Sequence, residues 1–362
     1  METLRTTRIS KLRGMLRAFF HFFGGHKDTS DSIHTVLKSN PLSVVSIASE
    51  EVGSMPASSS SRYQPRLLKD MDQEVMRAVL DAACEIPAFP AVISELVACL
   101  HSPNVSEARV SELVQLDPSL STSVLRVANS ALYATDQTVV SVKTGVMLIG
   151  FDLLQSIAMR GAVSGMIQMD RVKASKQDPD ALWAHSIAAS MYARELAQRL
   201  PRMESSEAVT AGLLHDIGKI VMCMCYPDKV ADLINPQTSL LGESLLAKEE
   251  RLFGACHTVF GAVLAKNWGL PDSLVCAIEL HHHGNCADRL KSYSKHIRDL
   301  TIVTCLANQF AKLGGFSGND NEIDIFSPEV TDRLNLPCDL MEAMKKMPKD
   351  MPKRINTVIS CL

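Results

Sequence analysis

The chain has 362 residues, of which 46% are hydrophobic and 21% are charged, so it can bury a sizeable core. Its net charge of −3 excludes the strong basic excess of many nucleic-acid-binding proteins, and no uninterrupted apolar run reaches the roughly 18 residues of a membrane-spanning helix. The ten cysteines lie mostly within apolar segments and form no C-x-x-C pair, which indicates reduced, buried thiols in a cytoplasmic protein.

Residues 1–27 differ from the rest of the chain. The stretch "RISKLRGMLRAFFHFF" combines basic residues with an apolar stripe at helical spacing, formed by Ile9, Leu12, Leu16, Phe19 and Phe23. A basic amphipathic helix of this kind can lie on the anionic inner surface of a membrane, or it can dock on its own protein or on a partner. The stretch lacks a small-residue cleavage site, so we do not interpret it as a secretory signal peptide.

Residues 28–66 are rich in serine. A segment such as "SEEVGSMPASSSSRYQP" cannot bury much apolar surface, so it predicts a flexible, disordered linker. Helical periodicity begins at residue 67. We expect a helical domain over residues 67–316 and a more polar helical tail over residues 317–362, with one or two helices near 327–349.

Helix start signals recur along the compact part of the chain. Ser106 precedes "EARVSELVQL", Ser141 precedes another apolar periodic run, and Asp117 and Asp178 each precede a proline. A side-chain oxygen ahead of the run can accept a free N–H of the first turn, and proline suits that turn because it has no N–H to satisfy. Asn129, near the end of a run, is predicted to bond to the backbone. No strand pattern of useful length appears, so the fold class is all-α.

Histidines form the most informative pattern in the second half. His185, His215 and His257 are each embedded among apolar residues, and His281 and His282 end an apolar run. A single such histidine is usually a core residue. Several of them in consecutive helices of one bundle can converge on a common point.

The doublet His215-Asp216 in "GLLHDIGK" poses a geometric problem. Adjacent side chains on a straight helix diverge by about 100°, since a turn holds 3.6 residues. The two residues can therefore share one ion only if the helix is locally distorted, or Asp216 can bridge two ions with its two oxygens. Gly218, just after the doublet, would ease such a distortion.

These segments together resemble an HD-superfamily helical domain, through "LWAHS", "GLLHDIGK", "GACHTVFGAVLAKNWGLP" and "LHHH". The first half resembles the HDOD domain family, an HD-related output domain of bacterial signalling proteins, through "IPAFPAVISELVACL", "LVQLDPSLSTSVLRVANSALY" and "SVKTGVMLIGFDLLQSIAM". The likeness runs from about residue 85 to residue 312. It implies a multi-helix HDOD/HD-like bundle behind the N-terminal extension.

The resemblance also implies a set of metal ligands for a divalent ion such as Fe, Mn or Mg. In HD phosphohydrolases these are a histidine, the His-Asp doublet and a later aspartate, and multinuclear relatives add further histidines. The matching positions in this chain are His185, His215, Asp216, His257, His281, His282 and, where the later aspartate would stand, Asn308. Lys219, in the "HDIGK" context, can face a substrate phosphate or can be a surface lysine.

This chain departs from the catalytic pattern at three points. Asn308 replaces a carboxylate by a neutral, weaker ligand that cannot act as a base. "HHHGNCAD" stands where the GYP signature of cyclic-dinucleotide hydrolases would follow. Ala181 occupies the position of a glutamate expected one turn before His185 in trinuclear members.

Two functions follow as hypotheses. The first is a non-catalytic signalling module that binds a regulatory protein partner or a second messenger, in the cytoplasm or peripherally at the inner membrane surface through residues 1–27. The second is a metal-dependent phosphohydrolase with an altered ligand set, in which Asp216 bridges the ions. A metal bound without turnover is an intermediate case. Nucleic-acid binding is not expected, because no basic stripe accompanies the core motifs.

Overall fold

The structure is a computed structural model that describes residues 63–362, apart from residues 88–89, 101, 103, 134–136, 168, 202, 286, 318–321 and 324–325. The predicted amphipathic helix of residues 1–27 and most of the predicted linker lie outside the described residues. The chain divides into two units, residues 1–62 and residues 63–362. In the second unit every described regular element is a helix, which confirms the all-α prediction.

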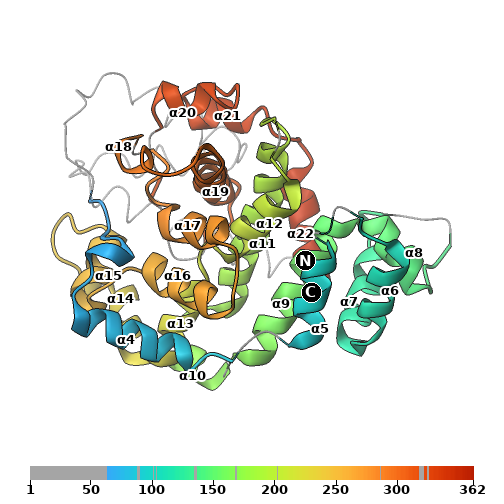
Figure 1. Cartoon of the computed structure of the whole chain (residues 1–362), viewed down its shortest axis with the longest axis horizontal. Coiled ribbons are helices and arrows are strands. Elements are labelled where there is room, and N and C mark those ends of the chain that lie inside the picture. The colour runs from blue at the N-terminus through green and yellow to red at the C-terminus, as the bar shows by residue number, and fades with distance from the viewer. Residues whose placement is uncertain are drawn as a thin grey trace, which may run out of the picture. The chain divides into compact units, whose positions relative to one another are not determined.

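Residues 63–166 contain six described α-helices, and three of them begin at the signals identified in the sequence (Figure 1). They are α4 (Gln73–Cys84), α5 (Ala91–Leu100), α6 (Glu107–Gln115), α7 (Pro118–Ala128), α8 (Val142–Ile149) and α9 (Phe151–Met166). Ser106, Asp117 and Ser141 each accept a backbone N–H of the first turn of α6, α7 and α8, respectively. Asn129 ends α7, where its side chain bonds to the carbonyls of Leu125 and Val139 as predicted.

Helices α5 to α9 enclose a core of their own. Its members are aliphatic side chains that recur at helical spacing and are fully buried, among them Leu96, Leu113, Val124, Val127 and Leu154. The contiguous burial of these residues explains why α5 to α9 fold against one another. Helix α4 belongs elsewhere, since it packs on α16 and α13 of the second half.

The second half supplies the helices that carry the histidines. They are α10 (Met169–Ala174), α11 (Pro179–Ala197), α12 (Ser205–Leu214), α13 (Ile217–Cys225), α14 (Pro227–Ile234), α15 (Leu245–Phe253), α16 (His257–Asn267), α17 (Asp272–Leu280), α18 (Ala287–Leu290) and α19 (Lys295–Leu313). Two short 3-10 turns, η2 (Leu68–Asp70) and η3 (Pro236–Thr238), complete this part. Asp178 caps α11 as predicted. Helix α11 packs along α12 and α19, and α16 packs against α13 and α17.

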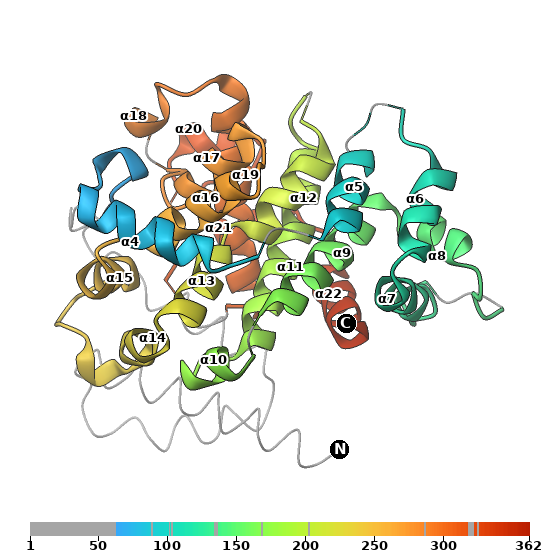
Figure 2. The ribbon, with the colours of Figure 1, turned by 60° about the horizontal axis from the view of Figure 1, so that its bottom comes forward.

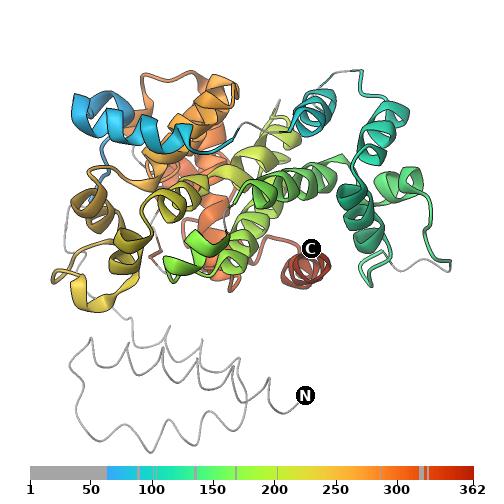
Figure 3. The same ribbon diagram turned by 90° about the horizontal axis from the view of Figure 1, so that it is seen from below.

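The C-terminal segment joins both groups of helices. Helices α20 (Pro328–Asp332) and α21 (Leu340–Met344) lie in the range predicted for the tail, whereas α22 (Met351–Cys361) has no counterpart among the predictions. Helix α22 contacts α7 and α11, and Figure 3 shows it in red at the C-terminus between the two groups. Arg126 and Arg160 bind the carbonyl oxygens of Cys361 and Leu362.

One segment, Ser205–Cys225, is long and apolar enough to cross a bilayer by composition, but 89% of its window is buried inside the protein, as in a core helix. The nine described cysteines are free, as expected. The prediction that the cysteines are buried does not hold for all of them. Cys84 and Cys338 are exposed.

Candidate metal centre

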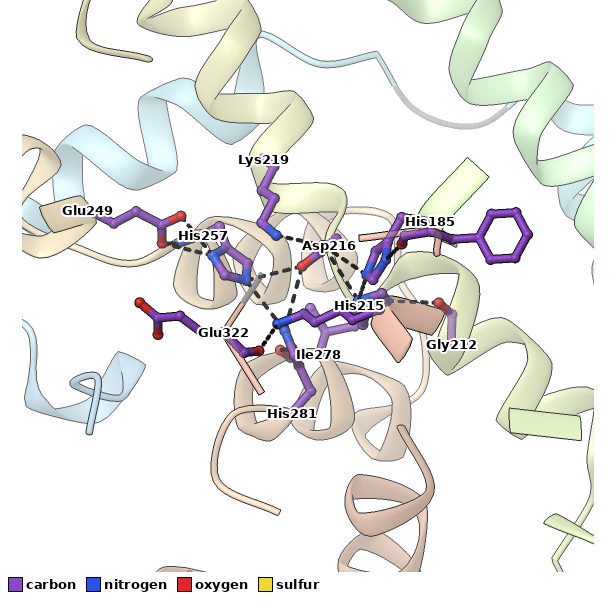
Figure 4. A network of polar contacts seen from close by, with 12 residues as sticks. His185, Gly212, His215, Asp216, Lys219, Glu249, His257, Ile278, His281 and Glu322 are labelled. Atoms are coloured by element: carbon purple, nitrogen blue, oxygen red, sulfur yellow. Dashed lines mark hydrogen bonds and ion pairs between the residues drawn. The ribbon is translucent and has the colours of Figure 1, made fainter. Parts of the chain in front are cut away.

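The candidate histidines and Asp216 lie at or next to helix ends, except His185, which lies within α11. His185 is in α11, His215 and Asp216 occupy the two-residue break between α12 and α13, and His257 is the first residue of α16. His281 and His282 directly follow α17. Figure 4 shows His185, His215, His257 and His281 pointing toward Asp216. The packing of α11, α13, α16 and α17 thus brings together residues that are up to about a hundred positions apart in the sequence.

The break at His215-Asp216 resolves the geometric problem of adjacent ligands. Asp216 has φ −99° and ψ 10°, outside the helical range, and α13 restarts at Ile217. Gly218 has a different role from the predicted one. A Cβ atom on Gly218 would lie 1.9 Å from the carbonyl oxygen of His257, so the glycine lets α13 and α16 approach closely.

The two carboxylate oxygens of Asp216 face two different groups of imidazoles. Oδ2 lies 3.5 Å from Nε2 of both His185 and His215. Oδ1 lies 3.2 Å from Nε2 of His257 and 3.6 Å from Nε2 of His281. The ligand atoms of His185, His215 and Asp216 lie within 4.8 Å of one another, as do those of the second group, His257, His281 and His282. Either group could hold a metal ion, and Asp216 lies between them; that it bridges two ions stays a prediction.

The Nδ1 atoms of three of these histidines donate hydrogen bonds to backbone carbonyl oxygens. Nδ1 of His215 bonds to the carbonyl of Gly212 at 2.8 Å, Nδ1 of His281 bonds to the carbonyl of Ile278 at 2.8 Å, and Nδ1 of His185 bonds to the carbonyl of Phe316. Because a carbonyl only accepts, each Nδ1 must carry the proton. In the neutral ring Nε2 therefore presents a lone pair, which is the form that ligates metals.

The Nδ1 atom of His257 bonds to a carboxylate instead of a backbone carbonyl. Oε2 of Glu249 lies 2.7 Å from Nδ1 and accepts the backbone N–H of His257 at 2.9 Å, while Oε1 lies 3.0 Å from Nδ1. Glu249 is fully buried. The sequence did not identify this residue, because "LLAKEERLF" has the pattern of an exposed charged helix and nothing in it distinguishes Glu249 from Glu250.

Burial and charge set the protonation of the cluster. Burial lowers the pKa of His185, His215, His281 and His282, so the neutral rings are favoured. For His257 burial acts in the same direction, but the Glu249 and Asp216 carboxylates outweigh it and raise the pKa. Burial alone would raise the pKa of Asp216, yet the surrounding imidazoles and Lys219 hold it well below its usual value.

The arrangement fits a metal ion on chemical grounds. Nε2 of His185 and Nε2 of His215 lie 3.1 Å apart, and Nε2 of His257 and Nε2 of His281 lie 3.4 Å apart. Two lone pairs this close need a shared cation, either a proton or a metal ion. Nε2 of His282 is buried and has no hydrogen-bond partner among the described residues. These donors suit borderline divalent ions.

Two lysines add positive charge to the cluster. Nζ of Lys219 lies 2.7 Å from Oδ2 of Asp216. Lys312, on α19, donates to the carbonyl of Glu322 at 2.9 Å. Burial lowers the pKa of His185 and His282, and the positive charge of Lys312 lowers it further. Lys312 was not identified from the sequence. Its charge adds to that of Lys219 and disfavours a further cation.

Asn308 lies on α19, where it is buried. Its Oδ1 has no hydrogen-bond partner among the described residues. No hydrogen bond among the described residues joins its Oδ1 to either group of ligands, so its assignment as a ligand stays a prediction.

Comparison with known proteins identifies the relatives of this chain. The family model described as the HDOD domain matches residues 86–284. An uncharacterized protein of Treponema pallidum is 23% identical over 208 residues, which is 57% of this chain and 39% of that protein. The chain thus spans about two fifths of the length of this curated relative.

Solved structures share the fold. An HDOD domain protein of unknown function from Geobacter sulfurreducens is 23% identical with a TM-score of 0.54, covering 78% of this chain and 94% of that one. A proposed phosphohydrolase from Shewanella amazonensis is 24% identical with a TM-score of 0.57, covering 79% and 98%. A proposed signal transduction protein from Marinobacter aquaeolei is 22% identical with a TM-score of 0.60, covering 80% and 64%.

Proposed function

Since the chain belongs to the HDOD domain family, we propose that it is a signal-transduction module that acts by binding, without hydrolysis. Its partner is a regulatory protein or a small-molecule second messenger. The description of one solved relative as a signal transduction protein supports this role. The histidine groups then have a structural task, which is to hold α11, α13, α16 and α17 in one arrangement that a partner recognises.

The proposal that the chain does not hydrolyse phosphate esters rests on the charge of the two ligand groups. Asp216 is the single carboxylate in the two ligand groups, and Lys219 is bound to it at 2.7 Å. A hydrolytic metal must be held firmly enough to polarise phosphate and activate water. One carboxylate that is shared with an ammonium group neutralises little of the charge of two divalent ions. Asn308, where the catalytic pattern has an aspartate, contributes no charge.

Metal analysis joined to hydrolysis assays tests this proposal. Purified full-length protein should contain less than one equivalent of metal and should hydrolyse neither phosphomonoesters nor cyclic dinucleotides with added Mn²⁺ or Fe²⁺. Turnover that Asp216→Ala abolishes would overturn the proposal. Asp228→Ala, an exposed aspartate on α14, is the matched control and should behave as the parent in every assay.

A metal-dependent phosphohydrolase is the second candidate, because both oxygens of Asp216 face ligand groups. One solved relative is described as a phosphohydrolase. His185 and His215 would hold one divalent ion, His257, His281 and His282 would hold another, and Asp216 would contact both. A bound ion there would supply Lewis acidity toward a phosphate ester. The assays above decide between the two candidates.

We also propose that residues 1–27 bring the chain to the inner membrane surface. Their basic residues support this location because anionic lipid headgroups attract positive charge. Their apolar stripe supports it because apolar side chains can insert at the membrane interface. Co-sedimentation with vesicles of anionic phospholipid should be lost on removal of residues 1–27 and weakened by high salt. Equal sedimentation of both forms would refute the proposal. Cytoplasmic location is the corresponding expectation for the remainder of the chain.

A further inference from the structure

A cavity of about 850 Å³ lies between α5, the start of α12 and the turn that joins α16 to α17. Figure 2 shows α5, α9 and α12 next to one another, and α9 contacts both of the other helices. Met159, a buried residue of α9, also lines the cavity. No candidate metal ligand belongs to the described lining, so this cavity is separate from the candidate metal centre.

One wall of the cavity is an apolar stripe on α5. Ile93, Val97 and Leu100 line the cavity and are spaced four and three residues apart, so they lie on one face of the helix. Because an α-helix rises 1.5 Å per residue, this stripe is about 10 Å long. A second helix laid along a stripe of that length presents side chains at positions i, i+3, i+4 and i+7 to it.

The second wall is the turn between α16 and α17. Trp268 and Leu270 line the cavity there and are half-buried, so part of each apolar side chain remains uncovered. Nε1 of Trp268 donates to the carbonyl of Pro87 at 3.0 Å, which holds the indole ring in place. Helix α16 begins at His257 and α17 ends just before His281, so the helices that carry this wall are those that position the histidine groups.

The start of α12 gives the cavity a negatively charged side. Glu204 and Glu207 lie about one helical turn apart, and they are the charged residues of the described lining. Glu204 is exposed and precedes α12 without capping a backbone N–H of its first turn. Glu207 is held in place, since it accepts the hydroxyl of Ser273 at 2.6 Å and lies 2.8 Å from Nε2 of His296. A partner with positive charge beside an apolar surface complements this combination of walls.

We propose that this cavity is a docking groove for an amphipathic helix of a partner protein, in which basic residues flank the apolar stripe. The apolar stripe of the partner packs against α5, Trp268 and Leu270, and a basic residue beside it pairs with Glu204. Burial of the two apolar surfaces drives the association, and the glutamates select a cationic helix over an anionic one. The inference rests on the proposed function and deepens it, since it gives the chemistry of the regulatory partner and the surface that binds it.

The test uses the full-length chain and a peptide of leucine and lysine, about 14 residues or roughly four helical turns long, whose leucines recur at helical spacing. One control peptide has the same composition but alternates leucine and lysine, so its apolar face has the period of a strand. The other keeps the helical spacing and has glutamate in place of lysine. By calorimetry the helical leucine-lysine peptide should bind about tenfold more tightly than either control, and high salt should weaken its binding.

Two pairs of variants locate the binding. Ala98→Trp should abolish it, because Ala98 is an exposed residue of the lining, whereas Ala91→Trp changes an exposed residue of the same helix outside the lining and should bind as the parent does. Glu204→Gln should weaken binding about two- to fivefold, as loss of an exposed ion pair does. Glu74→Gln, an exposed glutamate in the first turn of α4, should leave the affinity unchanged. Circular dichroism of each variant confirms folding.

The inference is overturned if the helical leucine-lysine peptide binds no more tightly than the two control peptides. It is also overturned if the two tryptophan variants bind this peptide alike, or if the two glutamine variants do.

The hydrolysis assays separate this inference from the proposed function. Selective binding of the helical peptide together with turnover that Asp216→Ala abolishes supports the groove and overturns the absence of hydrolysis. Absence of both peptide binding and turnover overturns the groove and leaves a second messenger as the ligand. Selective binding without turnover supports both proposals.

Discussion

Gly218→Ala offers a direct test of how the candidate centre is assembled. The Cβ atom of alanine at this position would lie 1.9 Å from the carbonyl oxygen of His257 and 2.6 Å from the backbone nitrogen of Gly261. Real Cβ atoms essentially never approach closer than 3.0 Å, so α13 and α16 would have to separate by about 1 Å. Neither clashing atom belongs to a flexible side chain, so the strain cannot be relieved by a rotamer change.

The expected change in the free energy of unfolding is the sum of two opposing contributions. Overpacking a tight interface costs about 1–3 kcal/mol, and contact between backbones places this site at the upper end. Alanine recovers up to about 1 kcal/mol of helix propensity relative to glycine. We expect the free energy of unfolding to fall by about 2 kcal/mol and the melting midpoint to fall by about 4 °C. Because the nearest clash involves His257, metal uptake should fall as well.

Urea unfolding followed by far-ultraviolet circular dichroism measures this change. Gly161→Ala is the matched control, since Gly161 lies exposed within α9 and its Cβ would meet no atom within 4 Å. That variant should gain about 0.5–1 kcal/mol. The reasoning is wrong if both variants shift stability in the same direction, or if Gly218→Ala takes up metal as the parent does.

Two further predictions concern Glu249, within α15, and Glu243, just before it. Glu249→Gln keeps the shape of the contact with His257 but removes its charge, so the affinity for Mn²⁺ or Zn²⁺ should fall about 10- to 100-fold by equilibrium dialysis. Glu250→Gln, the neighbouring variant, should retain the affinity, and equal losses in both would refute a specific role for Glu249. The bidentate contact with Arg251 lowers the pKa of Glu243 to about 2, below its ordinary value of 4.5. Since the folded-state pKa is depressed, the contribution of Glu243 is complete above about pH 4.5 and is lost as the pH falls toward 2. Glu243→Gln should lower the melting midpoint by about 1–2 °C at pH 7, and the two curves should converge near pH 2, whereas a constant difference would contradict this account.

Helix boundaries are the part of the fold that the sequence predicts best. Ser106, Asp117, Ser141 and Asp178 begin helices where expected, because an N-cap is a hydrogen bond between residues only two or three positions apart. Such a contact depends on local sequence alone. Helix α22 was not expected, since its stability comes from packing on α7 and α11, which lie far away in the chain.

The sequence by itself determined the helical class, the family likeness and the candidate ligands, because apolar periodicity and short motifs are written in neighbouring residues. The tertiary structure alone decided which atoms meet. It set the two oxygens of Asp216 toward two groups of histidines and engaged Glu249 with His257. The close approach of α13 and α16 at Gly218 brings Asp216 and His257 together. Contacts between residues tens of positions apart in the sequence depend on how whole helices pack. No pattern among neighbouring residues specifies which distant side chains meet.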